Sequence, residues 1–159
     1  MSSAGEYSIE PSLVNARHTG HGWLENENCS TTAGPSRLVY VPVYSRLFLS
    51  EASYWELASS LSIRNTDPDQ SIVVYRIDYY DTAGKLLQKY LETAHELDPM
   101  ATVTLTLPQS DVRGGAGANF LVRWSGDNDI NEPIIEVVMA GIRGTQSFSF
   151  IGSGQEIVE

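Results

Sequence analysis

The chain has 159 residues, of which 42% are hydrophobic and 19% are charged, a balance typical of one folded domain rather than of a disordered chain. Its 20 acidic residues outnumber its 10 lysines and arginines and give a formal net charge of -10. A field of that sign repels phosphate backbones and anionic membrane surfaces, so nucleic acid is excluded as a partner. No apolar run approaches the roughly 18 residues of a membrane-spanning helix, so no transmembrane segment is predicted.

Residues 1–36 carry mostly small and polar side chains without a helix or strand period, which predicts a flexible N-terminal tail. The tail contains the only cysteine, Cys29, so an intrachain disulfide cannot form. It also contains His18 and His21, which would need further ligands to hold a metal ion. The first residues lack a basic segment followed by an apolar one, so the protein is cytoplasmic if this N-terminus is native, unless a leader has been removed.

Segments rich in β-branched and aromatic residues then recur at intervals of about 8–12 residues, with turn-forming residues between them. The expected strands are residues 38–44, 57–64, 71–80, 86–91, 101–107, 119–125, 133–142 and a last one that contains Phe148 and Phe150. Residues 50–56 fit either a short helical turn or, from Trp55 onward, the start of the second strand. Residues 37–152 are therefore predicted to form an all-β domain, an antiparallel immunoglobulin-like β-sandwich of about seven to eight strands, followed by a loose C-terminal end at residues 153–159.

Alternation within the strands predicts which side chains reach the core. The expected core-facing sets are Leu57, Leu61 and Ile63; Val73, Tyr75, Ile77 and Tyr79; Val103, Leu105 and Leu107; Phe120, Val122 and Trp124; and Ile135, Val137 and Met139. Pro42 has no amide hydrogen to donate to a neighbouring strand, so the first strand is expected at a sheet edge. That edge, or the edge of the last strand, could pair with a second copy of the chain and form a homo-oligomer.

Acidic side chains gather in three loops that antiparallel strands would bring to one end of the sandwich. Calcium binds about six to eight oxygen ligands, which paired loops can supply. The candidate calcium ligands are Asp67, Asp69, Asp127, Asp129 and Glu132. The loop that begins at Asp127 lacks the glycine and the glutamate of an EF-hand, so the alternative is a set of solvated turns and no cofactor.

Tyrosine is common at recognition surfaces because its ring buries much area at a low entropy cost. Tyr79 and Tyr80 point to opposite faces of one strand, so one of the two rings is expected near the surface. Together with Tyr44 or Tyr90 it could form a patch that binds a protein partner. The alternative is ordinary packing of these rings within the sandwich.

The sequence lacks a constellation for nucleophilic or acid–base catalysis. There is no G-x-S-x-G motif, the only thiol lies in the tail, and His95 is the only histidine of the domain. The glycine-rich segment 111–118 lacks the lysine and the serine or threonine of a phosphate-binding loop. No catalytic residue and no enzyme activity are predicted.

Several short stretches together resemble one family. They are V-Y-V-P-V-Y-S at 39–45, L-S-I-R-N-T-D-P-D at 61–69, Y-Y-D-T-A-G-K-L at 79–86, G-A-G-A-N-F at 115–120 and N-E-P-I at 131–134. The set resembles a bacterial family known as domain of unknown function 3124, over about residues 38–152. Members of that family usually look exported, often behind a signal or lipoprotein leader, so the resemblance implies the periplasm or the cell envelope.

A fold-level similarity implies a protein that is not an enzyme. The asparagine–proline turn that follows an alternating strand is similar to that in the immunoglobulin-like domain of water-stress proteins, which are binding or protective domains rather than enzymes. We therefore expect a non-enzymatic binding or structural module of the bacterial cell envelope. The alternative is a calcium-dependent sandwich whose acidic loop end binds a metal and then a partner.

Overall fold

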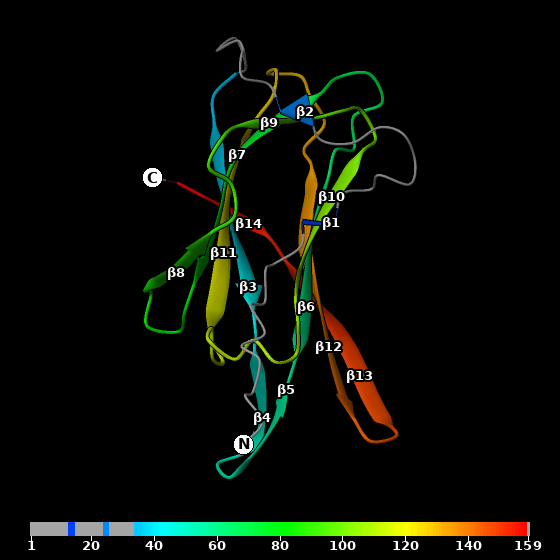
Figure 1. The fold of residues 1–159 in the computed structure, drawn as a ribbon. Helices are drawn as coiled ribbons and strands as arrows, with labels where there is room; N and C mark the ends of the chain where they lie inside the picture. Colours follow the sequence, from blue (N-terminus) through cyan, green and yellow to red (C-terminus); the bar gives the residue numbers. More distant parts are fainter. Residues whose placement is uncertain (1–12, 15–23, 26–33, 159) are drawn as a thin grey trace, which may run out of the picture.

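The structure, a computed structural model, describes residues 13–14, 24–25 and 34–158. Two antiparallel sheets pack face to face, which confirms the all-β antiparallel sandwich predicted from the sequence (Figure 1). The described residues include no helix that could cross a membrane. Predictions made for His18, His21 and Cys29 lie outside the described residues.

Sheet A has five strands within the described residues. Their spatial order is β1 (Leu13–Val14), β10 (Thr102–Leu107), β6 (Ala58–Arg64), β12 (Ile134–Arg143) and β13 (Gln146–Ser153). All neighbouring pairs are antiparallel. In this part of the chain β13 pairs with β12 alone, so it forms an edge of sheet A.

Sheet B has seven strands within the same residues. The order along its main path is β14 (Gln155–Ile157), β3 (Arg37–Val43), β11 (Ala118–Ser125), β7 (Ile72–Tyr80), β9 (His95–Leu97) and β2 (Leu24–Glu25). Beside this path β8 (Leu86–Lys89) pairs with β7. Two dipeptides of the predicted tail, β1 and β2, thus pair with strands of the sandwich.

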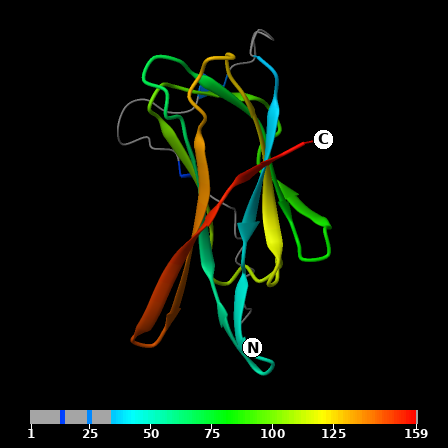
Figure 2. The same ribbon diagram turned by 180° about the vertical axis from the view of Figure 1, so that it is seen from behind.

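A separate hairpin joins β3 of sheet B to β6 of sheet A. It consists of β4 (Arg46–Ser50) and β5 (Ser53–Glu56), with Leu47 opposite Trp55. A helical turn in residues 50–56 is therefore wrong, because the flanking apolar residues pair across a hairpin. The β4–β5 hairpin and the β12–β13 hairpin both extend beyond the two-layer body at the same end, which we call the twin-hairpin end (Figure 2).

The core lies between the two sheets and is formed by the side chains that the alternation predicted in four of the five strands. Buried there are Leu57, Leu61, Ile63, Val103, Leu105, Leu107, Phe120, Val122, Trp124, Ile135, Val137 and Met139. In β7 the prediction is wrong at Val73 and Tyr75, which are only half-buried, whereas Ile77 and Tyr79 are fully buried. The register of β7 against β11 shifts between Arg123 and Trp124, so an extra residue in β7 reverses its alternation at this bulge.

The C-terminal residues differ from the expected loose end, because β14 pairs with β3 from Tyr40 to Leu38. The chain passes from sheet A to sheet B at Gly154, whose amide donates to the carbonyl of Ile135 at 2.8 Å. A Cβ at Gly154 would lie 2.7 Å from that carbonyl, so the crossing requires glycine. The sequence predicted that β3 lies at a sheet edge. This is wrong for residues 38–40, which pair with β14, whereas Pro42 lies beyond the residues that β14 reaches.

Candidate functional site

The loop end of the sandwich brings together the three acidic loops that the sequence predicted there. Asn65 and Asp67 form its centre, and both are buried, with 2% and 5% of their surface exposed. The Asn65 amide donates to the carbonyls of Gln70, Leu97 and Asp98 at 2.8, 3.1 and 3.0 Å. These bonds connect the turn after β6 to the segment that precedes β10.

Asp67 connects the same turn to the loop between β11 and β12. Its Oδ1 accepts the amides of Asp69 and Gln70 at 2.9 and 2.8 Å, and its Oδ2 accepts the amide of Asn131 at 3.0 Å. These backbone bonds, Asn131 first, hold the pKa of the Asp67 carboxyl below its ordinary value. The carboxylate that was expected to bind calcium is thus engaged by the backbone.

The other four candidate calcium ligands, Asp69, Asp127, Asp129 and Glu132, have exposed side chains. Glu132 accepts a hydrogen bond from Arg37 at 2.7 Å. Within the described residues there is no group of three or more His, Cys, Asp or Glu side chains placed to hold a metal ion. The structure therefore brings the acidic loops together but not their carboxylates, and calcium binding stays a hypothesis.

The four tyrosines proposed as a recognition patch do not share one surface. Tyr79 is fully buried and its hydroxyl lies 3.0 Å from that of Ser45, so within the Tyr79–Tyr80 pair it is not the ring near the surface and it cannot belong to a recognition patch. Tyr80 is half-buried on the opposite side of β7, and Tyr44 packs against Phe150 with 5.9 Å between ring centroids. The reason is the period of the strand, which turns neighbouring side chains to opposite faces.

Tyr90, the fourth of these tyrosines, lies beside an ion pair. Burial raises the pKa of its hydroxyl to about 12. The adjacent Asp111 is buried, which by itself raises a carboxyl pKa, but the hydrogen bonds and charge of Arg113 outweigh burial and keep the pKa of Asp111 low. Arg113 contacts Asp111 at 2.7 and 3.0 Å and so fixes the start of the glycine-rich loop.

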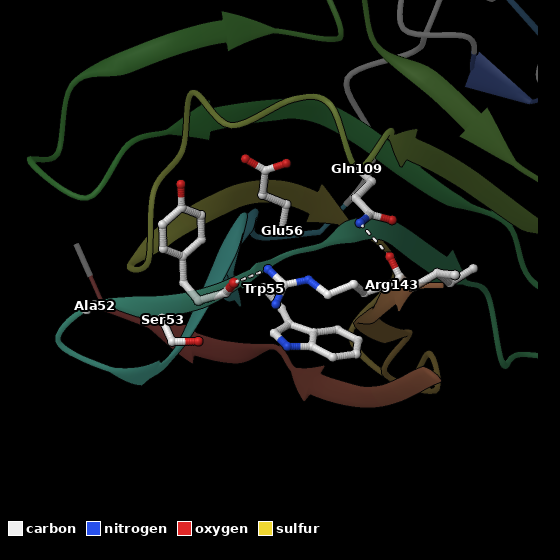
Figure 3. Close-up of a pocket in the computed structure, with 8 residues that line it drawn as sticks. Ala52, Ser53, Trp55, Glu56, Gln109 and Arg143 are labelled. Carbon is white, nitrogen blue, oxygen red and sulfur yellow. Dashed lines mark hydrogen bonds between the residues drawn. The ribbon is translucent and has the colours of Figure 1, made fainter. Parts of the chain in front are cut away.

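The twin-hairpin end holds a pocket that the sequence did not predict. Its volume is about 470 Å³, and it is lined by Ala52, Ser53, Tyr54, Trp55, Glu56, Gln109, Ile142 and Arg143 (Figure 3). The Arg143 guanidinium lies over the Trp55 ring, 5.3 Å from its centroid, and donates to the carbonyl of Tyr54 at 3.1 Å. Gln109 donates to the carbonyl of Ile142 at 3.1 Å and so closes one side.

A row of aromatic rings supports this pocket from within. Trp55 packs on Phe148 at 5.0 Å, Phe148 stacks on Phe150 at 6.2 Å, and Phe150 meets Tyr44 at 5.9 Å between centroids. Because the rings come from β5, β13 and the residue that follows β3, they fix the two hairpins relative to each other. The pocket therefore rests on a packed base rather than on loops.

Large apolar side chains are exposed around this pocket. Phe48, Leu49 and Ile142 expose 53%, 60% and 62% of their surface. Arg46, on β4, places its guanidinium 4.9 Å from the ring of Tyr54. Exposed apolar groups beside anchored arginine and aromatic rings are typical of surfaces that bind other proteins.

The sequence was also compared with known families. It matches the family described as "Protein of unknown function (DUF3124)" over residues 36–157. The chain belongs to the DUF3124 family. The match begins just before β3 and ends with β14, so this DUF3124 domain includes the twin-hairpin end and the loop end alike.

Among solved structures, one similar chain is described as "Crystal Structure of Thermotoga maritima 1070". It has 14% sequence identity and a TM-score of 0.46, and the alignment covers 77% of the DUF3124 chain and 95% of the other. A likeness of this size carries no argument about function. A comparison with curated proteins found no match.

Sequence reasoning missed the twin-hairpin end of the DUF3124 domain, although a signal was present. Leu47-Phe48-Leu49 and Tyr54-Trp55 are two apolar runs around a short polar segment, which is the pattern of a hairpin. The pairing of Phe148 with Gly141 in the β12–β13 hairpin places Phe148 at the same end as Trp55. Only the folded chain shows the contact between these two rings.

Proposed function

We propose that the DUF3124 domain is a non-enzymatic binding module of the bacterial cell envelope and that it docks a protein partner at the twin-hairpin end. The observation that carries the proposal is the cluster of exposed Phe48, Leu49 and Ile142 around a pocket held by Trp55 and Arg143. Leaving such apolar surface in water is costly, and a partner that covers it recovers the hydrophobic free energy.

The chemistry of the site fits a protein rather than an anion or a metal. Phe48, Leu49 and Ile142 are exposed on the two hairpins, while Arg46 and Arg143 are each placed over an aromatic ring. Arginine, tyrosine and tryptophan are the residues that most often dominate the binding energy of protein interfaces. An immunoglobulin-like sandwich, the class to which we assign this domain, commonly binds through one such end.

Location in the periplasm or cell envelope is part of the proposal and is supported by the exported character of proteins that the sequence resembles. Fractionation of the native bacterium checks it, because a protein found only in the cytoplasm would refute this part. Purified protein that hydrolyses an ester, phosphate or glycoside substrate, and loses that activity on His95→Ala, would refute the non-enzymatic part.

Site-specific photocrosslinking in the native bacterium tests the docking site. A photoreactive amino acid in place of Phe48 or Ile142 is expected to give one discrete adduct of higher mass. The control is the same probe at Asp129, which is exposed in the loop between β11 and β12, and Figure 1 shows this loop at the opposite end of the sandwich. Adducts from Asp129 that equal those from Phe48, or no adduct from either hairpin position, would refute docking at this end.

A second proposal concerns self-association through the outer edge of β13, which has no partner strand except β12 among the described residues and which we expect to pair with β13 of another copy. Residues Gln146–Ser153 contain neither charge nor proline, the two devices that usually protect an edge strand. Beside the edge, exposed Ile151 lies opposite exposed Val138. The chain carries a net charge of -10, so two copies repel each other less when they meet at an uncharged strand such as this one.

Light scattering of the purified protein tests the pairing. We expect a dimer that becomes monomeric on Ile151→Lys, because a two-fold axis brings the two added charges together. The matched control is Thr106→Lys, which adds the same charge to the same sheet but on β10, away from the edge. A monomeric parent protein, or a dimer that both variants disrupt equally, would contradict this pairing.

A further inference from the structure

The two hairpins of the twin-hairpin end diverge from a pair of neighbouring strands. In sheet A the ladder between β6 and β12 ends at the pair Ala58–Ala140, and β12 continues to Arg143 in its hairpin with β13. The chain that precedes Ala58 also leaves this ladder, because β5 pairs with β4 (Figure 2). Among the described residues β5 has no other partner strand, so one of its two edges is open.

The open edge of β5 faces the pocket between the two hairpins. The amide of Leu57 donates to the carbonyl of Ser45 at 3.0 Å, so the backbone groups of Leu57 are directed toward the start of β4. Successive residues of a strand direct these groups to alternate sides, so Tyr54 and Glu56, three residues and one residue before Leu57, direct theirs away from β4. The carbonyl of Tyr54 agrees with this direction, because it accepts a hydrogen bond from Arg143 of β12 at 3.1 Å.

Side chains occupy positions in this pocket that the backbone of a neighbouring strand would otherwise take. The hydrogen bond from Arg143 to the Tyr54 carbonyl is exposed, and the guanidinium lies over the Trp55 ring (Figure 3). Gln109 donates to the carbonyl of Ile142 in the same way, and that bond is also exposed. Replacing one exposed hydrogen bond by another changes the free energy little, so a backbone amide of another chain can displace Arg143 from the edge of β5.

The arginines of this end indicate the charge of the partner. Four arginines elsewhere in the domain pair with a carboxylate, whereas Arg46 and Arg143 form no ion pair among the described residues. Glu56 also lines the pocket but is not paired with either of them in this part of the chain. Once displaced from the Tyr54 carbonyl, the Arg143 guanidinium can bind a carboxylate with two parallel hydrogen bonds. Charge complementarity therefore favours a partner segment with an acidic side chain beside Arg143.

The other face of the β4–β5 hairpin favours an apolar side chain. Phe48 lies opposite Tyr54 in the ladder, and their ring centroids are 5.7 Å apart. Both side chains are exposed. Because the side chains of a strand alternate between its two faces, a segment in which acidic and apolar residues alternate would match both faces of the hairpin.

We propose that the partner adds an extended segment, with acidic and apolar side chains in alternation, as a strand along the open edge of β5. This inference rests on the proposed docking at the twin-hairpin end and specifies the kind of chain that docks there. Backbone hydrogen bonds to Tyr54 and Glu56 supply affinity, while Arg143 and the Phe48–Tyr54 pair select the side chains. An unpaired strand edge is a ready template for such addition.

Proline substitution tests the backbone pairing, with a photoreactive amino acid at Phe48 as the probe in the native bacterium. Glu56→Pro removes an amide hydrogen that the added strand needs, and proline is tolerated on an edge strand where the amide faces outward. We expect the yield of the adduct to fall about fivefold or more, as for the loss of at least one hydrogen bond. The matched control Glu56→Ala keeps the amide hydrogen and should keep the yield of the parent protein.

Two further comparisons complete the test. Melting temperatures check that the variants fold, and Tyr54→Pro against Tyr54→Ala repeats the comparison at the other outward-facing residue if Glu56→Pro is destabilised. Arg143→Glu reverses the charge beside the added strand and should also lower the yield. Lys85→Glu makes the same reversal in the exposed β7–β8 turn and should leave the yield unchanged.

The outcomes separate this inference from the docking on which it rests. Equal yields from the proline and alanine variants would overturn strand addition and leave docking at this end intact. A yield from Arg143→Glu that equals that of the parent would overturn the acidic character of the segment. No adduct from the parent protein at either hairpin would overturn docking itself and this inference with it.

Discussion

Asn65 is the residue whose replacement should damage the loop end most. Its side chain is 2% exposed and donates to the carbonyl of Gln70, just before β7, and to the carbonyls of Leu97 and Asp98, at the end of β9. Its own Oδ1 accepts the amide of Asp67 at 3.0 Å. Asn65→Ala removes all four hydrogen bonds and leaves buried carbonyl groups without a donor.

The expected cost follows from these bonds. A net hydrogen bond contributes about 1 kcal/mol, and an orphaned buried group costs about 1–3 kcal/mol. The Asn65 side-chain amide has two hydrogens for three carbonyl acceptors, so we count the bonds that it donates as about two full hydrogen bonds. We therefore expect Asn65→Ala to lower the free energy of unfolding by about 3 kcal/mol.

Urea denaturation of the variant and the parent protein measures this loss. The midpoint should fall while the m-value stays constant, because the compactness of the two end states does not change. Asn128→Ala, at an exposed position of the β11–β12 loop, is the control and should change stability by less than about 0.5 kcal/mol. A loss below about 1 kcal/mol for Asn65→Ala would refute the reasoning that these bonds hold the loops together.

Three other outcomes follow from the same structure. A Cβ added at Gly114 would lie 2.1 Å from the Tyr79 hydroxyl and 2.7 Å from the Ala118 Cβ, so Gly114→Ala should destabilise the domain by about 2 kcal/mol or more in urea denaturation; a change near zero would contradict that contact. The carboxyl pKa of Asp67 and of Asp111 is lowered in the folded state, so the stability that each contributes is present above the ordinary aspartate pKa and is lost as pH falls through the lowered value. Thermal melts between neutral and acid pH should show this loss of stability, and Asp67→Asn should make the loss on acidification smaller. Because both oxygens of Asp67 accept backbone amides, we expect calcium to leave the melting temperature unchanged relative to a chelator, whereas a large rise would support the calcium hypothesis.

Much of the fold could be predicted because period-2 alternation is a local property of the chain. Thr102–Leu107 shows it plainly, and Val103, Leu105 and Leu107 are the residues that the sandwich buries. The bulge near Tyr75 could not be predicted in the same way. It depends on how β7 is paired with β11, and a pattern within one strand holds no information about its partner.

The candidate sites were harder to predict for the same reason. The convergence of the acidic loops followed from antiparallel order, but the direction of each carboxylate did not, and Asp67 turns its oxygens to backbone amides. The pocket around Trp55 combines residues from β5 and β12 whose contact arises only after both hairpins have formed. Composition and spacing indicate which residues are available, whereas tertiary packing decides which of them meet.

The pairing of β3 has a consequence for how the chain reaches its native state. Its two neighbours, β11 and β14, lie far along the chain, since Tyr40 pairs with Leu121 on one side and with Gln155 on the other. Contacts between such distant segments form late, because a long loop must close before they stabilise anything. Until then β3 exposes open donors and acceptors on both sides to any neighbouring molecule. Refolding yield should therefore fall as protein concentration rises, since intermolecular encounters then compete with the late closure of sheet B.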